Sequence, residues 1–589
     1  MRYLFFCLTG LIFISGFYFR QQQLRTLPYY PTDIQETSNN LYLVSNKGLK
    51  TVVLYSAEFD KPLLTREFEE IPTGIATRGD YAYITTFETV GKVHFLNLIT
   101  GEVEKSLITG SGANSPVISP EGNTLYVLNQ FQNTVTRIDL NTRKIIGTAE
   151  VLREPKGAVV CPEGKYLFVT NFLPAQRADI DTVAASVSVM DLDGFVKVKD
   201  IQLPGGSNAL RDICLSPDGR YVLIVHNLGR FGLPTNQLLQ GWMNTSAMSM
   251  IDVETLEKSG TVLLDDPERG AAGIWGINCT DDKIVITHSG THEISVIDYP
   301  AFLEKFNTRA DKSSLNYDLT FMSGIRHRIN LIGNGPRNFI ISGDNVIIPT
   351  YFSDILNIVD LSDNQVRFIH LNENRTESET DRGKRVFNDA AYCFQNWQSC
   401  NGCHPGEGRT DGLNWDLLND GVGNPKNTKS LLYSHVTPPV MISGIRVTAE
   451  IAVRAGFRHI QFNEISEDLA MSVDEYLKSL RPVPSPYLVN GKLSGKAERG
   501  KLVYQRLGCG DCHSGTYFTD LKMYRIGQDI EFEKGWDTPT LNEVWRTAPY
   551  LFDGRAATME DVFKIHRHGI EEEISDIEVD ELVEYVNSL

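Results

Sequence analysis

Between about residues 30 and 370, short apolar runs alternate with polar positions and are separated by turn signals. A period of two is typical of half-buried β-strands, because successive side chains point to opposite faces of a sheet. One unit recurs: a Pro-Glu/Asp-Gly turn leads into a strand, and a later strand ends in Asp. The clearest copies of the first part are SPEGNTLYVLN, CPEGKYLFVTN and SPDGRYVLIVHN, which start at Ser119, Cys161 and Ser216. The second part recurs as VTRIDL, VSVMDLD, MSMIDVE, ISVIDYP and LNIVDLS.

The units begin near residues 36, 78, 119, 161, 216, 280 and 342. This spacing fits four-stranded propeller blades, which close into a ring because one blade cannot bury both faces of its sheet. The array resembles the YVTN-type seven-bladed propellers, and we expect an all-β propeller over residues 30–372. Polar residues that follow inner strands, as in HSGTHE from His288 and GNGPRNF from Gly333, are either satisfied within loops or line a ligand site in the central funnel.

Beyond residue 372 a different unit is duplicated. Arg382-Gly-Lys384 recurs as Arg499-Gly-Lys501, and NTKSLLYSHVTPPVMISG recurs in altered form as DTPTLNEVWRTAPYLFDG. YLKSL ends the first copy and YVNSL ends the second. The sequence predicts two mainly α units over 381–480 and 498–589, joined by a Pro- and Gly-rich linker over 481–497.

Each unit contains one C-x-x-C-H motif, formed by Cys400, Cys403 and His404 in the first and by Cys509, Cys512 and His513 in the second. This is the attachment pattern of c-type haem. Two thiols add to the two vinyl groups of the haem, and the adjacent His binds the iron. A dithiol redox motif or a zinc site would not explain the His after each pair. The sequence therefore predicts two covalently bound haem c groups, with His404 and His513 as iron ligands.

The segment TPTLNEVWRTAPYLFDGRAATMEDV, which follows the second motif, resembles the bacterial diheme cytochrome c peroxidase superfamily. The resemblance covers residues 381–589 and is closer in the second unit than in the first. It implies two cytochrome c-like units that pass electrons between their haems. Phe552 stands where the family pattern usually has a His.

The resemblance also implies a six-coordinate second haem. In the family the sixth ligand is a Met in the segment after Asp-Gly-Arg, and here His566 occupies that position, with His568 two residues further on. Imidazole in place of Met lowers the reduction potential of the iron. We therefore expect His566 to be the sixth ligand.

The first haem is expected to be the reactive one. The displaceable His of the family is absent from the loop GRTDGLNWDLLNDGVGNPK, so the iron is either open or reached by His435 or His459. By comparison with the second unit, His459, Gln461 and Glu464 are the expected acid–base residues, and Trp415 is the expected electron relay. The family also binds Ca²⁺ between its units, but no loop here has a ligand spacing that would show such a site.

Charge and the N-terminus describe the setting of the protein. The chain has 56 basic and 74 acidic residues, a net charge of −18, which argues against nucleic acid as a partner. Residues 3–19 are uncharged and lie between Arg2 and Arg20, the pattern of an export signal. We assign residues 1–25 to a signal peptide or a membrane anchor, and the sequence leaves open which of the two. Covalent haem is attached outside the cytoplasm, so we expect a periplasmic or other extracytoplasmic protein.

These observations predict an exported dihaem oxidoreductase of the peroxidase type, supplied with electrons by a redox partner protein or a small donor. A non-enzymatic electron carrier, whose propeller docks a partner or a ligand, is the alternative. In a third reading, the propeller binds a substrate protein that the haems modify.

Overall fold

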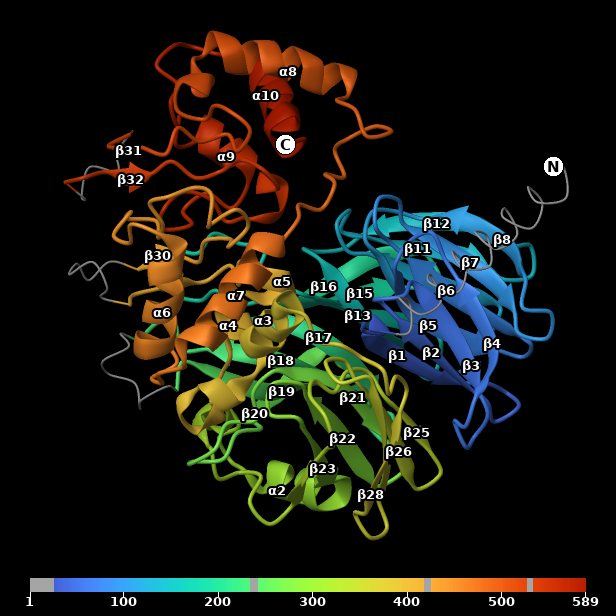
Figure 1. The fold of residues 1–589 in the computed structure, drawn as a ribbon. Coiled ribbons are helices and arrows are strands. Elements are labelled where there is room, and N and C mark those ends of the chain that lie inside the picture. The colour runs from blue at the N-terminus through green and yellow to red at the C-terminus, as the bar shows by residue number, and fades with distance from the viewer. Residues whose placement is uncertain (1–25, 234–241, 418–424, 527–532) are drawn as a thin grey trace, which may run out of the picture.

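The computed structural model describes residues 26–233, 242–417, 425–526 and 533–589. The predicted signal or anchor segment lies outside the described residues. Within them, seven four-stranded antiparallel sheets follow one another along the chain, and each is built from four consecutive strands. The first strands of neighbouring sheets contact each other all the way round, including β1 against β25, so the sheets form a closed seven-bladed propeller (Figure 1).

The first four blades contain β1 (Pro31–Glu36), β2 (Tyr42–Asn46), β3 (Thr51–Tyr55), β4 (Pro62–Glu67); β5 (Pro72–Arg78), β6 (Tyr81–Thr86), β7 (Lys92–Asn97), β8 (Val103–Ile108); β9 (Ala113–Ile118), β10 (Thr124–Asn129), β11 (Thr134–Asp139), β12 (Lys144–Glu150); and β13 (Pro155–Val160), β14 (Tyr166–Asn171), β15 (Ser186–Asp191), β16 (Val196–Gln202). The last three contain β17 (Ser207–Leu215), β18 (Tyr221–Gly229), β19 (Asn244–Asp252), β20 (Glu257–Leu263); β21 (Ile274–Cys279), β22 (Lys283–His288), β23 (Glu293–Asp298), β24 (Arg326–Asn330); and β25 (Ile340–Ser342), β26 (Asn345–Thr350), β27 (Ile355–Asp360), β28 (Val366–His370).

The repeated sequence signals have local structural reasons. The Pro-Glu/Asp-Gly turn joins the first strand of a blade to the second, so the predicted units began one strand late within each blade. The Asp that ends the third strand accepts backbone N–H bonds from the turn after it, as Asp139 does from Thr142 at 2.6 Å and Asp252 from Thr255 at 2.9 Å. Such Asx turns reverse the chain into the fourth strand.

Ring closure joins the two ends of the propeller sequence. Ile34 and Val44 of the first blade pack with Ile347 and Leu356 of the seventh in one buried cluster. Asp354, which is fully buried, accepts the backbone N–H of Tyr29 at 2.9 Å and of Tyr30 at 3.0 Å. Among the described strands, no blade takes a strand from the other end of the chain, and the two ends are joined by apolar packing and by this Asp.

The remaining chain is a helical region on one side of the propeller (Figure 1). Its helices are α3 (Glu379–Asn388), α4 (Cys400–Cys403), α5 (Pro405–Gly408), α6 (Ala449–His459), α7 (Glu467–Ser479), α8 (Gly495–Arg506), α9 (Met559–Lys564) and α10 (Asp576–Asn587). Two short hairpins accompany them: β29 (Asn414–Trp415) with β30 (Lys426–Asn427), and β31 (Met523–Tyr524) with β32 (Trp536–Asp537). The propeller also contains α2 (Tyr299–Thr308), between β23 and β24.

Equivalent positions of the two halves of this region bond reciprocally. The N–H of Asn427 donates to the carbonyl of Phe552 at 2.8 Å, and the N–H of Asp537 donates to the carbonyl of Ile442 at 3.0 Å. Phe552 stacks on Trp536, with ring centroids 4.2 Å apart and planes 8° apart. This stacking holds the loop at the position where the peroxidase pattern has a His.

Candidate haem sites

The first C-x-x-C-H motif forms the short helix α4 and the residue after it. The ring of His404 is held by its Nδ1–H, which donates to the carbonyl of Arg409 at 3.1 Å. Since a carbonyl only accepts, Nδ1 carries the proton and Nε2 keeps its lone pair free for a metal. Burial lowers the pKa of His404 to about 4, so the ring is neutral at pH 7.

The second motif repeats this arrangement. Nδ1–H of His513 donates to the carbonyl of Phe518 at 3.2 Å, again five residues along the chain. Burial lowers the pKa of His513 as well. Both histidines therefore have the tautomer that iron ligation requires, in two segments of the same local design.

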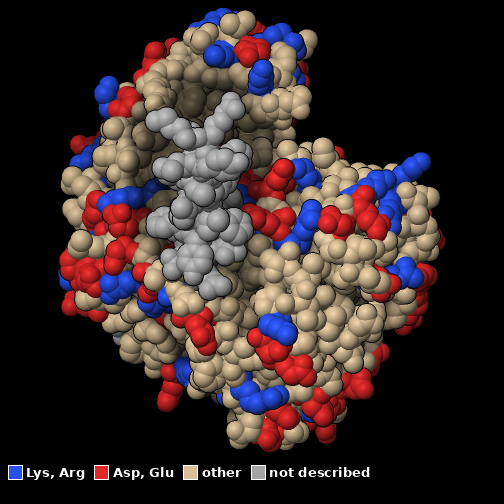
Figure 2. All heavy atoms as spheres, turned by 45° about the vertical axis from the view of Figure 1, so that its right-hand side comes forward, with Lys and Arg blue, Asp and Glu red and all other residues tan. Residues whose placement is uncertain are grey.

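A second imidazole faces His513. The ring of His568 lies with its centroid 6.4 Å from that of His513, and the planes are 52° apart. Burial, and then the neighbouring His513, lower the pKa of His568 to about 4, so this ring is also neutral. The lobe that holds the C-terminal elements is hollowed on the face shown in Figure 2.

The imidazole beside His513 is thus that of His568. The sequence had predicted His566 instead. The reason is local: α9 ends at Lys564, and the chain then turns through Arg567, which has a left-handed backbone with φ 44°. His568 follows this turn, and its N–H bonds back to the carbonyl of Val562 at 3.1 Å.

The same turn follows α6 in the first unit. Phe462 has the left-handed backbone there, with φ 51°, and the N–H of Asn463 bonds back to the carbonyl of Phe457 at 3.0 Å. Gln461 and Asn463 therefore occupy the backbone positions of His566 and His568. Helix α6 is five residues longer than α9. For this reason, comparison of the two units by sequence alone placed His459, and not Gln461, at the position of His566.

The three predicted acid–base residues separate in the structure. His459 is exposed, and Glu464 is 75% exposed and pairs with Arg458 at 3.1 Å. Gln461 is 4% exposed, and its amide lies beside Cys400, 3.9 Å from Sγ. The structure therefore places only Gln461 next to the first motif.

The other predicted ligand of the first iron has partners of its own. Nε2 of His435 lies 3.0 Å from the carboxylate of Asp474, and both side chains are buried. Arg454 bonds to the same carboxylate. His435 therefore belongs to an ion-paired cluster between α6 and α7.

Trp415 is buried beside the first motif. It packs with Cys403, Leu413 and Met243, and its Nε1–H donates to Asp411 at 2.9 Å. In the second unit the hydroxyl of Tyr524 donates to Asp520 at 2.6 Å, at the equivalent position. This shared contact gives Trp415 a structural role in the β29–β30 hairpin, whether or not it also relays electrons.

The propeller contributes to the first site, which the sequence did not predict. Asn244, at the start of β19, donates from Nδ2 to Sγ of Cys403 at 3.1 Å, and Met243 belongs to the cluster around Trp415. A Cβ on Gly229, at the end of β18, would lie 3.1 Å from the Trp415 ring. The fifth blade is therefore one wall of the first site.

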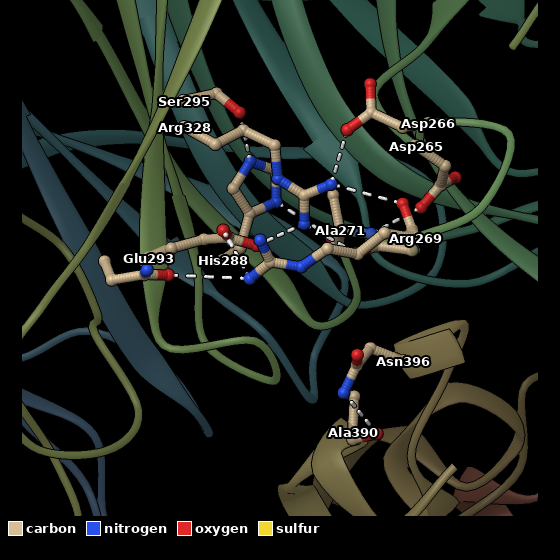
Figure 3. A network of polar contacts seen from close by, with 12 residues as sticks. Asp265, Asp266, Arg269, Ala271, His288, Glu293, Ser295, Arg328, Ala390 and Asn396 are labelled. Carbon is tan, nitrogen blue, oxygen red and sulfur yellow. Dashed lines mark hydrogen bonds and ion pairs between the residues drawn. The ribbon is translucent and has the colours of Figure 1, made fainter. Parts of the chain in front are cut away.

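A buried network shapes the neighbouring edge of the propeller (Figure 3). The guanidinium of Arg328 bonds to Glu293 and donates to the carbonyl of Gly270 at 2.6 Å. The N–H of Gly270 donates to the carbonyl of Gln395 at 2.8 Å, just before the first motif. A Cβ on Gly270 would lie 2.3 Å from the carbonyl oxygen of Asn396, so the two segments meet backbone to backbone.

Two observations concern the described residues alone, which do not include the predicted anchor segment. There, no three His, Cys, Asp or Glu side chains are grouped as metal ligands. No helix in this part of the chain is long and apolar enough to cross a membrane.

No family model matches the chain. It is 25% identical over 272 residues to hydrazine synthase subunit gamma of Kuenenia stuttgartiensis, a match that covers 35% of this chain and 76% of that subunit. It is 33% identical over 215 residues to subunit beta of the same enzyme, which covers 35% of this chain and 53% of that subunit. The chain is related to these subunits. A solved structure of K. stuttgartiensis hydrazine synthase has the same fold over 58% of this chain and 96% of its own, with a TM-score of 0.50 and 20% identity.

Proposed function

We propose that this chain is an exported dihaem c-type redox protein in which the second haem transfers electrons and the first binds the reacting molecule. The observation that carries the proposal is the pair of neutral imidazoles of His513 and His568. Two imidazoles on opposite sides of one metal ion, each with a nitrogen about 2 Å from it, have ring centroids about 6 Å apart. The 6.4 Å spacing fits an iron held between them.

Within this proposal, Cys509 and Cys512 attach the second haem, and His513 and His568 hold its iron. Two imidazoles leave no position for a substrate and keep the potential low, which suits an electron donor. The carbonyl of Phe518 fixes the ring of His513 through Nδ1. These residues would hold the haem, which would supply one-electron transfer when bound.

At the first site, Cys400, Cys403 and His404 attach the haem, and no His occupies the position equivalent to His568. Asn463 stands there instead, and an amide is not among the usual axial ligands of haem iron. When bound, the haem would supply one-electron transfer. The chain contributes two amides, Gln461 beside Cys400 and Asn463 at the position equivalent to His568, and amides do not titrate.

The residues around the first site argue against the predicted peroxidase activity. Cleavage of peroxide needs a group that moves a proton between its oxygens, and His459 and Glu464 both face solvent. We therefore favour redox chemistry on a small uncharged substrate over peroxide reduction. Stopped-flow mixing with hydrogen peroxide tests this choice: a rate far above that of free haem would restore the peroxidase assignment.

The relatives suggest that the chain works in an assembly. Both are named as subunits of one enzyme, hydrazine synthase. We propose that this chain likewise associates with partner subunits, one of which exchanges electrons with the second haem. Size-exclusion chromatography of the natively purified protein, with mass spectrometry of the co-eluting chains, tests the association.

The decisive experiment compares His568→Ala with His566→Ala. Electron paramagnetic resonance of the ferric wild type should show one low-spin haem and one high-spin haem. His568→Ala should convert the low-spin signal to high spin, while His566→Ala, the matched control two residues away, should keep it. Both variants should retain two covalent haems by mass. Loss of the low-spin signal in His566→Ala alone would refute the assignment.

A further inference from the structure

Basic side chains from several blades gather where the propeller meets the loop that follows His404. Arg211 lies on β17 of the fifth blade, Arg337 precedes β25 of the seventh, and Lys156 lies on β13 of the fourth. Arg211 is 9% exposed and Arg337 is 6% exposed. In a chain with a net charge of −18, such a concentration of buried cations is unusual.

The two guanidinium groups share one aromatic ring. The guanidinium carbon of Arg337 lies 3.3 Å from the ring centroid of Trp275, and that of Arg211 lies 4.2 Å from it. Both guanidinium groups therefore lie against Trp275, whose ring attracts cations but accepts no N–H bond of the kind that an oxygen does. Burial, and then the positive charge of Arg337, lower the pKa of Arg211 to about 9, and burial lowers the pKa of Arg337 to about 10.

Neither group is neutralised by the part of the chain that the structure describes. The Nε atoms of Arg211 and Arg337 are buried without a hydrogen-bond partner. Glu407 is the carboxylate that raises the pKa of Arg337, but it is bonded to Lys47 and also lies 3.8 Å from Lys384. Two further cations, Lys47 and Lys384, therefore compete with Arg337 for that carboxylate. Burial of unpaired charge is costly unless an anion compensates it.

Solvent reaches this region. The side chains of Lys47 and Glu407 are 30% and 53% exposed, although both lie between the propeller and the helical region. Glu407 itself has a left-handed backbone, with φ 65°, in the turn directly after the first haem motif. Space therefore lies beside Glu407, three residues after His404 in the chain.

We propose that Arg211 and Arg337 form a binding site for a small oxyanion with two coplanar oxygens, of the carboxylate type. The guanidinium fork donates two parallel N–H bonds and matches this geometry, which a spherical halide does not. Burial, and then the nearby charge of Arg211, lower the pKa of Lys156 to about 8, and Lys156 adds positive charge beside Arg211. The proposal is independent of the ligation and the activity of either haem.

The test is calorimetric titration of the haem-loaded protein with sodium formate, at constant ionic strength set with chloride. The wild type should bind formate, and Arg211→Gln and Arg337→Gln should each weaken binding at least tenfold. Arg337→Lys keeps the positive charge but loses the guanidinium fork, so its affinity for formate should fall between that of the wild type and that of Arg337→Gln. Arg220→Gln, which changes a 61% exposed side chain paired with Asp252, should bind like the wild type.

Three outcomes would overturn the proposal. The first is that the wild type releases no heat beyond the chloride baseline, and the second is that both Gln variants bind formate as tightly as the wild type does. The third is that Arg220→Gln weakens binding as much as Arg211→Gln and Arg337→Gln do. Formate bound at a haem iron would change the absorption spectrum and would persist in the Gln variants, which separates that outcome from binding at the arginines. If a Gln variant does not fold, thermal unfolding of the wild type decides: formate must raise the midpoint more than chloride does at equal ionic strength.

Discussion

At the scale of single residues, the histidines show how surroundings select a role. His226 and His288 follow the apolar runs of inner strands and could be taken for funnel residues, but both are fully buried and bonded at both ring nitrogens. His226 contacts the carbonyl of Asn227 at 2.9 Å and Ser249 Oγ at 2.8 Å. His404 and His513, in contrast, bond to backbone carbonyls through Nδ1 only. The free nitrogen distinguishes a candidate ligand from a structural His.

His226 predicts a measurable pH dependence of stability. Burial lowers its pKa from 6.5 to about 4, so the unfolded chain binds the proton more readily. Its contribution to stability is complete above pH 6.5 and is lost as the pH falls towards 4, by up to about 3 kcal/mol. Chemical unfolding between pH 4 and 7 should show a shallower acid decline in His226→Gln than in the wild type. The exposed His327→Gln should decline like the wild type, and identical slopes for all three proteins would contradict the prediction.

The sequence could identify the segment that approaches His513 but not which of its histidines does so. The resemblance placed a His after the Asp-Gly-Arg segment, and the structure has an imidazole from that segment beside His513. Which of two histidines lies there depends on where α9 ends and on the left-handed turn at Arg567. A left-handed turn is usually marked by Gly, so an Arg at position 567 gave no sign of this turn in the sequence. In the first unit, the greater length of α6 likewise led the sequence comparison to His459, whereas Gln461 and Asn463 occupy the equivalent positions in the structure.

At the scale of secondary-structure elements, the repeated Arg-Gly-Lys motif has a packing reason. A Cβ on Gly383 would lie 1.8 Å from the carbonyl oxygen of Ser472 in α7, and one on Gly500 would lie 1.8 Å from that of Glu581 in α10. In each half, the first helix therefore crosses the last one backbone to backbone. The duplication was visible in the sequence because this close contact admits only Gly.

Substitution of these glycines should separate the helices. Gly383→Ala and Gly500→Ala should each lower the free energy of unfolding by at least about 2 kcal/mol, since the clash is with backbone that cannot rotate away. Gly456→Ala is the control, because a Cβ there meets nothing within 4 Å, and it should stabilise α6 by up to about 1 kcal/mol. Denaturant unfolding measures all three. A neutral Gly383→Ala would show that the contact is not close.

Neighbouring blades are also positioned for a covalent link. Sγ of Cys214 on β17 lies 3.6 Å from Sγ of Cys279 on β21. Both line a cavity of about 500 Å³ together with Asp33, Asp212 and Asn338. The two cysteines are 65 residues apart, so their proximity follows from the ring and could not be predicted from spacing.

In an oxidising compartment, Cys214 and Cys279 should form a disulfide by exchange with a disulfide-carrying oxidant. A loop of this length should gain about 4 kcal/mol of stability. Thiol labelling of unfolded protein should find two fewer free thiols without reductant than with it, and the reductant should lower the unfolding midpoint. Cys279→Ser should abolish both effects, whereas Cys161→Ser should keep them. Full labelling of the oxidised wild type would exclude the bond.

At the scale of the whole molecule, a buried chain of charges joins three parts of the sequence. Arg409, in the loop after the first haem motif, donates to Glu543 at 2.8 and 3.0 Å. Arg546, three residues after Glu543, donates to Glu154 of the propeller at 3.0 and 3.2 Å. All four side chains are less than 10% exposed. The carbonyl of the same Arg409 holds the ring of His404, so domain docking and the orientation of His404 depend on one residue.

The sequence predicted the propeller and the duplicated region separately but not their junction. Periodicity records which face of a strand is buried, not which blade meets another domain. The residues of the junction, such as Glu154 and Asn244, fall at strand ends and carry no motif. Their partners lie 392 and 159 residues away. The resemblance to peroxidases concerned only the second region, and it contained no information about a wall supplied by a propeller.

The buried charge chain predicts how removal of one partner affects the assembly. Glu154→Gln leaves Arg546 with Glu543 only, and removal of one member of a buried pair costs about 3–5 kcal/mol. We expect a loss of this size in the free energy of unfolding, together with faster proteolysis in the 481–497 linker. Glu572→Gln, which removes one of the two carboxylates paired with the half-exposed Arg506, should change stability by no more than about 1 kcal/mol. The double variant Glu154→Gln/Arg546→Gln should recover part of the loss, because the unpaired charge is then gone. If Glu154→Gln were as mild as Glu572→Gln, apolar contacts rather than this charge chain would hold the helical region on the propeller.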